Sequence, residues 1–134
     1  MATAKRVTYF KAKIADKPGS LHDLIKNLKA KDLGLLSLKG ISKGTQGEVL
    51  VVAKSPDKLR SAWKDSGLLI EEGIAFYLSG IDKAGALQGD LDALSKAGVN
   101  IVATEAVAAG KSYGAILWVA PADIEKTAKA LGAK

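Results

Sequence analysis

Two loops of this sequence share a pattern that suits the binding of a small charged ligand. They read Asp16-Lys17-Pro18-Gly19-Ser20-Leu21 and Asp82-Lys83-Ala84-Gly85-Ala86-Leu87. Each loop precedes a helix-like stretch, and free backbone N–H groups at the start of a helix attract an anion such as a carboxylate. Gly19 and Gly85 let a ligand approach the backbone closely, while Asp16 and Asp82 can face an ammonium group. The same loops also read as ordinary strand-to-helix turns in which Asp16 acts only as a cap, and both interpretations stay open.

Catalytic chemistry has little support in the sequence. His22 is the only histidine and there is no cysteine, so zinc sites and thiolate nucleophiles are not expected. Asp90 and Asp92 are too close in sequence to share one helix face. No phosphate-binding glycine motif follows a strand, and no serine has a local nucleophile signature. We therefore expect a non-catalytic protein without a metal or cofactor.

The two loops belong to a longer repeat that fills the chain, and we assign residues 1–72 to the first copy and 73–134 to the second. In the first copy, apolar periodicity predicts a helix that begins near Ser20 and lies before Gly34. Ser20 and Asp23 resemble a capping box. The other predicted elements are strands at Val7–Ile14, Leu35–Ile41, Gly47–Lys54 and Leu68–Ile70, and a helix after Pro56.

The second copy repeats this order without its final element. Its predicted elements are a strand at Ile74–Ile81, a helix striped by Leu87, Leu91 and Leu94, strands at Val99–Val107 and Tyr113–Ala120, and a helix after Pro121. No sixth element follows that helix. We therefore expect the second copy to lack its last strand, which leaves an unpaired sheet edge.

A βαββαβ unit with right-handed crossovers gives an antiparallel sheet with both helices on one face. The prediction is therefore an α+β protein of two tandem ferredoxin-like units. The third strand of each copy, Val49–Ala53 and Ala115–Ala120, is apolar without alternation. Such strands are buried on both faces, so either the sister copy or a second chain must cover the face that the helices leave open. We expect a homo-oligomer, most simply a dimer.

The order of short motifs in both copies resembles the ACT domain, the small-molecule-sensing module of amino-acid metabolism. A strand that ends in Asp-Lys-Pro-Gly-Ser-Leu is followed by a helix, by Gly34 and by another strand. In the second copy, Ala97-Gly98-Val99-Asn100-Ile101 is similar to a Gly-Val-Asn-Ile motif that is frequent in that family. The second copy departs from the pattern at Ala84, where proline is usual, and the first at Leu36, which stands opposite Asn100.

The resemblance implies a regulatory module that binds an amino acid at an interface between ACT units, near the loop before the first helix. Asn100 can donate and accept hydrogen bonds in such a site, although a role at the turn or strand end is the interpretation that we place first. The residues that the resemblance points to are Asp16, Pro18, Gly19, Ser20, Leu21, Asp82, Gly85, Ala86, Leu87 and Asn100.

An RNA-binding protein is the alternative, because RNA-recognition motifs share the βαββαβ order and carry stacking aromatics on the first and third strands. Lys111-Ser112-Tyr113-Gly114-Ala115 is similar to that family's basic and aromatic pattern. Ala115 nevertheless stands where the main stacking aromatic is expected. We rank nucleic-acid binding second.

Charge and hydropathy fit a cytoplasmic protein that does not enter a membrane. The net charge is +6, and the lysines are spread along the chain rather than clustered. No apolar run approaches the roughly eighteen residues that a membrane-spanning helix needs, and the first residues lack the apolar segment of a signal peptide.

Overall fold

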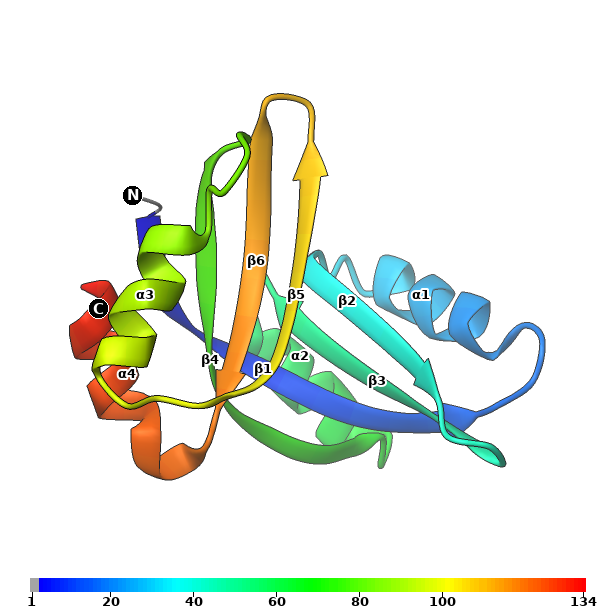
Figure 1. Ribbon diagram of the computed structural model, residues 1–134. Coiled ribbons are helices and arrows are strands. Elements are labelled where there is room, and N and C mark those ends of the chain that lie inside the picture. The colour runs from blue at the N-terminus through cyan, green and yellow to red at the C-terminus, as the bar shows by residue number, and fades with distance from the viewer. Residues whose placement is uncertain (1–2) are drawn as a thin grey trace. The chain divides into compact units, whose positions relative to one another are not determined.

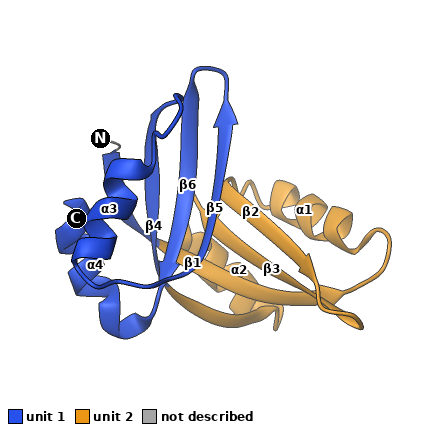
Figure 2. Ribbon diagram, in the orientation of Figure 1, with its two compact units in different colours: residues 1–7, 74–134 blue, residues 8–73 orange. Residues whose placement is uncertain are grey.

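The computed structural model describes residues 3–134, which form an α+β fold (Figure 1). The elements are β1 (Thr3–Ala15), α1 (Ser20–Ala30), β2 (Leu35–Ser42), β3 (Gln46–Ala53), α2 (Pro56–Asp65), β4 (Leu69–Ile81), α3 (Gln88–Lys96), β5 (Ile101–Ala109), β6 (Ser112–Val119), the short 3-10 helix η1 (Pro121–Asp123) and α4 (Ile124–Leu131). Hydrogen bonds join the strands in the order β2-β3-β1-β4-β6-β5. The chain divides into two compact units (Figure 2).

Unit 2 contains residues 8–73 and has its own hydrophobic core. Antiparallel pairing places Phe10 opposite Val51 and Ala12 opposite Val49, and all four side chains are fully buried. Side chains alternate between the two faces of a strand, so these residues form one apolar face. Both helices of the unit cover that face, through Leu24 and Leu28 of α1 and Leu59 and Trp63 of α2.

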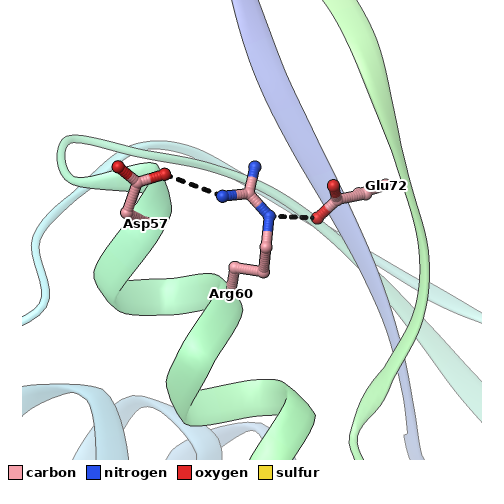
Figure 3. Close-up of polar contacts among 3 residues, drawn as sticks. All are labelled: Asp57, Arg60 and Glu72. Atoms are coloured by element: carbon pink, nitrogen blue, oxygen red, sulfur yellow. Dashed lines mark hydrogen bonds and ion pairs between the residues drawn. The ribbon is translucent and has the colours of Figure 1, made fainter.

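Polar contacts fix α2 to β4 within unit 2 (Figure 3). The Arg60 side chain donates from Nε to Glu72 at 2.8 Å and from Nη1 to Asp57 at 2.7 Å. Its guanidinium also lies 5.6 Å from the centre of the Phe10 ring. Both carboxylates hold the pKa of Arg60 above its usual value, chiefly through the hydrogen bond with Glu72.

Tyr9 gives unit 2 a pH-dependent element on the face away from the helices. Its hydroxyl donates to Glu71 at 2.8 Å, and its ring lies so close to Gly73 that a Cβ there would be 2.9 Å from Cε1. Burial, followed by the hydrogen bond and charge of Glu71, raises the pKa of Tyr9 from 10.0 to about 12.

We expect the free energy of unfolding to fall between about pH 10 and pH 12. The unfolded chain loses the Tyr9 proton from its usual pKa upward, whereas the folded chain keeps it. The contribution is complete below the usual pKa and is lost as the pH rises through the folded value. Urea unfolding at several pH values should show a shallower decline for Tyr9→Phe. An equal decline in the variant would contradict a raised Tyr9 pKa.

Unit 1 contains residues up to Val7 together with Ile74–Lys134. Its core brings together Phe76 and Leu78 of β4 with Leu94 of α3 and Leu131 of α4. The register pairs Phe76 with Leu117 and Gly80 with Tyr113. β6 lies between β4 and β5. It pairs antiparallel with β5, which is the last strand in the order. α3 and α4 both contribute to the core face, as in a ferredoxin-like unit.

No strand follows α4 in the described residues, as predicted, but the expectation that this leaves an unpaired sheet edge is wrong. β1 is thirteen residues long and lies beside β4 in the strand order, and its residues up to Val7 group with unit 1. Ala4 packs against the unit 1 core, and Arg6 forms a two-bond ion pair with Glu125 of α4 at 2.6 and 2.8 Å. The N-terminal part of β1 therefore fills the expected edge. The residue division at 72 and 73 stays a prediction.

Two local expectations are also corrected. Leu68–Ile70 and Ile74–Ile81 are not separate strands, because β4 runs continuously from Leu69 to Ile81. The capping box is absent among the described residues, since Gly19 is the N-cap of α1 and makes no side-chain cap bond. Glycine adopts the left-handed conformation there, at φ 90°, which places the chain turn one residue before Ser20.

The third strands of both units are buried, as their continuous apolar character predicts. By alternation, Val52, Ile116 and Trp118 lie on the faces away from the helices, and they are only 1%, 3% and 7% exposed in a single chain. The homo-oligomer stays a prediction that needs another observation.

Candidate functional site

The second predicted loop connects β4 to α3 within unit 1 and is held by its own backbone. Asp82 N–H donates to the Lys111 carbonyl at 2.9 Å, which ties the loop to the start of β6. Ala86 N–H donates to Lys83 and Gln88 N–H donates to Gly85, at 3.1 and 2.9 Å. Gly85 adopts φ 73°, a conformation that glycine takes without penalty. The helix begins only at Gln88, so Gly85 lies in a turn before the helix rather than at its first residue.

This loop forms one wall of a cavity of about 700 Å³. The end of β5 contributes Ala106, Val107 and Ala108 to the lining. The cavity lies entirely within unit 1 and most of its lining is apolar. The lining residues are Asp82, Lys83, Gly85, Ala86, Leu87, Gln88, Leu91, Asp92, Ala106, Val107, Ala108 and Tyr113. Four residues predicted from the sequence, Asp82, Gly85, Ala86 and Leu87, are thus brought together around one cavity.

Tyr113 lines this cavity from the sheet side. It belongs to the row of β6 residues that faces the helices, with Ala115 and Leu117. Its ring packs over Gly80, the residue paired with it on β4; a Cβ on Gly80 would lie 3.1 Å from the ring carbon Cε1. Burial, with a smaller contribution from the charge of Asp90, raises the pKa of Tyr113. The phenol therefore stays protonated at neutral pH.

Sequence reasoning missed Tyr113 and Asp90 as residues of this region. Asp90 is buried at 1% exposure. From the sequence it was considered only together with Asp92, as a pair of carboxylates that could share one helix face. The missed signal is spacing, because Asp90 lies three residues after Leu87 and four before Leu94, on the apolar stripe of the helix. A charged residue on such a stripe marks a buried polar site.

The first predicted loop has a different environment, in unit 2. Asp16 accepts a hydrogen bond from the Ser42 hydroxyl, and Ser20 N–H donates to the Lys17 carbonyl at 3.3 Å. Pro18, Gly19 and Leu21 are exposed. None of residues 16–21 lines the cavity described above. The structural role of Asp16 is therefore visible, and its ligand-binding role stays a prediction.

Asn100 lies apart from the cavity within unit 1. It is an exposed residue of the turn between α3 and β5. The cavity-lining residues of β5, Ala106 to Ala108, are near the other end of that strand, where Ala108 pairs with Tyr113 and Ile101 pairs with Val119. The structure does not bring Asn100 together with the second loop of the same unit.

The aromatic residues give the RNA-binding alternative no support. Stacking on bases requires exposed rings, but Phe76, Tyr113 and Trp118 are buried and the neighbouring Tyr77 is half-buried. Among residues 3–134, no group of three or more histidine, cysteine or acidic side chains could hold a metal ion. No helix in the described part of the chain is long and apolar enough to cross a membrane.

Comparisons with known proteins relate the chain to others through structure. The sequence matches no known protein family, and no curated protein matches it. Protein BT0572 from Bacteroides thetaiotaomicron superposes with a TM-score of 0.84 at 21% identity, over 96% of this chain and 88% of that one. The ligand-free regulatory subunit of aspartate kinase from Thermus thermophilus superposes with a TM-score of 0.64 at 12% identity, over 98% and 94%. The fold is ACT-like.

A third structure carries ligands. Aspartokinase III of E. coli, in complex with lysine and aspartate, superposes with a TM-score of 0.55 at 14% identity. The match covers 97% of this chain and 31% of that one. At these identities the likeness establishes the ACT-like fold, which confirms the α+β class.

Proposed function

We propose that the protein is a non-catalytic, cytoplasmic regulatory module that binds an amino acid in the unit 1 cavity. The observation that carries the proposal is the meeting of Asp82, Gly85 and Leu87 around one cavity beside an apolar wall. Ligand pockets typically combine apolar walls with a few polar groups that fix orientation. The likeness to regulatory subunits of aspartate kinase supports the regulatory role, and two tandem ACT units account for the repeat.

The loop suggests how the two charged groups of the ligand are bound. Ala86 N–H is already donated to Lys83, whereas Leu87 N–H has no backbone acceptor among residues 3–134. The ligand carboxylate then meets the Leu87 N–H and the Lys83 side chain, and the ligand ammonium meets Asp82. An acidic side chain, a basic side chain and a free backbone N–H on one lining favour a zwitterion over a simple anion or cation.

A thermal-shift screen against the twenty amino acids tests this function. We expect one or a few of them to raise the melting temperature, since binding to the native state alone stabilises by about 2.7 kcal/mol at a hundredfold excess over Kd. The N-acetyl form of an active amino acid lacks the ammonium group and serves as the matched control. If no amino acid stabilises the protein at millimolar concentration, the proposed function is wrong.

Within this proposal the protein acts as a homodimer through β5. This strand ends the strand order, contains one charged residue, Glu105, and exposes Val102 and Val107 at 65% and 67%. An exposed apolar edge strand is a template for pairing with another chain, and Val107 also lines the cavity. A second copy of β5 is the partner that continues the same antiparallel sheet.

We expect Val107→Lys to convert the dimer to a monomer, because a lysine at an edge strand opposes pairing. Light scattering at micromolar concentration gives the mass of each species. Val107→Thr keeps the branched shape and should remain a dimer. A monomeric wild-type protein under the same conditions would count against the homodimer.

A further inference from the structure

The aspartates of the two repeated loops are used differently by the fold. The Asp16 carboxylate accepts a hydrogen bond from the hydroxyl of Ser42, the last residue of β2. The Asp82 carboxylate makes no hydrogen bond or ion pair with any of residues 3–134, and Asp82 is exposed. One carboxylate is therefore engaged within its own unit, whereas the other is accessible to a ligand.

Strand pairing defines the position of Ser42 in unit 2. Ser42 pairs with Gly47 of β3. On its other side, Gly47 pairs with Ile14 of β1, which lies two residues before Asp16. The hydroxyl of Ser42 thus belongs to the strand end that faces the start of the first loop.

The same position in unit 1 holds a residue that cannot donate a hydrogen bond from its side chain. Ala108 of β5 pairs with Tyr113, whose partner on β4, Gly80, lies two residues before Asp82. Ala108 is therefore the counterpart of Ser42, and its methyl group has no donor. Asp82 and Ala108 both line the cavity, so this difference lies at the proposed ligand site.

The other main features of the two loops are shared. The backbone N–H of Leu21, like that of Leu87, has no backbone acceptor among the described residues, so both loops can bind a carboxylate. The side-chain types also agree, in the pairs Lys17 and Lys83, Gly19 and Gly85, Leu21 and Leu87, and Ile25 and Leu91. The group available to a ligand ammonium is what distinguishes the loops.

We propose that Ser42 closes the unit 2 loop to the ligand by engaging Asp16, so that each chain binds one amino acid, in unit 1. The inference rests on the proposed function and names the residue that decides which unit binds. At Asp82 an ammonium group meets a free carboxylate, whereas at Asp16 it would have to displace the serine hydroxyl. Hydrogen bonds to charged groups are the stronger ones, and one such bond changes affinity by about tenfold.

Titration calorimetry of the full chain with each of the twenty free amino acids tests the inference. Every amino acid that binds the wild-type protein should do so at one molecule per chain. In Ser42→Ala the Asp16 carboxylate loses its partner, so we expect a second binding event and a stoichiometry of two. Ser42→Thr is the matched control, because it keeps the hydroxyl and suits a strand, and its stoichiometry should stay at one.

The reciprocal change tests the same hydrogen bond in unit 1. Ala108→Ser supplies there the hydroxyl that Ser42 supplies in unit 2. We expect binding about tenfold weaker than in the wild type, because the ligand ammonium then competes with the hydroxyl for Asp82. Ala108→Cys adds a larger atom but only a weak donor, so it should weaken binding much less if hydrogen bonding, rather than size, is the cause.

The possible failures are distinguishable. The inference is overturned, and the proposed function stands, if the wild-type chain binds two molecules or if folded Ser42→Ala still binds one. It is also overturned if Ala108→Ser binds as tightly as the wild type, or if Ala108→Cys is weakened equally. Circular dichroism checks folding, and the Ala108 variants decide the question even if Ser42→Ala does not fold. If no amino acid binds the wild-type protein, the proposed function fails and the inference fails with it.

Discussion

Replacing Trp63 with alanine lowers the free energy of unfolding by about 3–5 kcal/mol, the range for removing a large aromatic side chain from a packed core. Trp63 is 1% exposed and lies in the unit 2 core with Phe10 and Leu59. The surrounding strands cannot collapse fully into the space, so the substitution loses both apolar burial and contacts. Urea unfolding followed by far-UV circular dichroism measures the change.

Trp63→Phe is the matched control for this prediction. The indole N–H of Trp63 has no hydrogen-bond partner among the described residues, so phenylalanine loses volume but no hydrogen bond. We expect a loss of about 1 kcal/mol, since volume changes of this size in a core are tolerated far better than truncation. A similar loss in both variants would mean that Trp63 is not tightly packed.

Gly85→Trp should abolish the stabilisation by an amino acid, about 2.7 kcal/mol at a hundredfold excess over Kd. Gly85 lines the cavity, and its added Cβ would meet only the Gln88 side chain, at 3.6 Å. The indole therefore has room to enter the space that the ligand needs. Thermal shift with and without the active amino acid measures the loss.

Gly19→Trp is the matched control, because it carries the same backbone cost without lining the cavity. Gly19 and Gly85 have φ of 90° and 73°, and a side chain in that conformation costs about 1–2 kcal/mol. A Cβ on Gly19 meets no atom within 4 Å. Both variants should melt lower than the wild type, but only Gly19→Trp should still respond to the amino acid. Loss of the response in both would indicate that the first loop also binds ligand.

The fold was largely predictable because its signals are local and repeated. The apolar spacing of Leu24 and Leu28 predicts the first helix. The glycines at 19 and 85 predict the turns before the helices. The continuity of β4 was missed because Glu71, Glu72 and Gly73 resemble a loop, although Glu72 is held by Arg60 and Gly73 lies against Tyr9. Such support comes from side chains distant in sequence, which local periodicity cannot show.

The candidate site was predictable only in part, for a similar reason. The Asp82–Leu87 loop could be identified because its pattern occurs twice in the sequence, and at least four of its residues line the cavity. Tyr113 belongs to the site only through strand pairing, which places it over Gly80. Its pattern in the sequence suggested base stacking instead. Which face of a strand a residue occupies depends on register, and register is a long-range property.

The assignment of β1 to both units has a consequence for the order in which the chain folds. Unit 2 is one continuous stretch, residues 8–73, and can form as soon as that stretch has left the ribosome. Unit 1 instead depends on joining Arg6 to Glu125, 119 positions apart, and closing so long a loop is slow and entropically unfavourable. Hydrogen exchange during refolding should therefore protect β2 and β3 before β5 and β6. The N-terminal part of β1 then remains an unpaired strand during synthesis, available to other chains until β4 has been made.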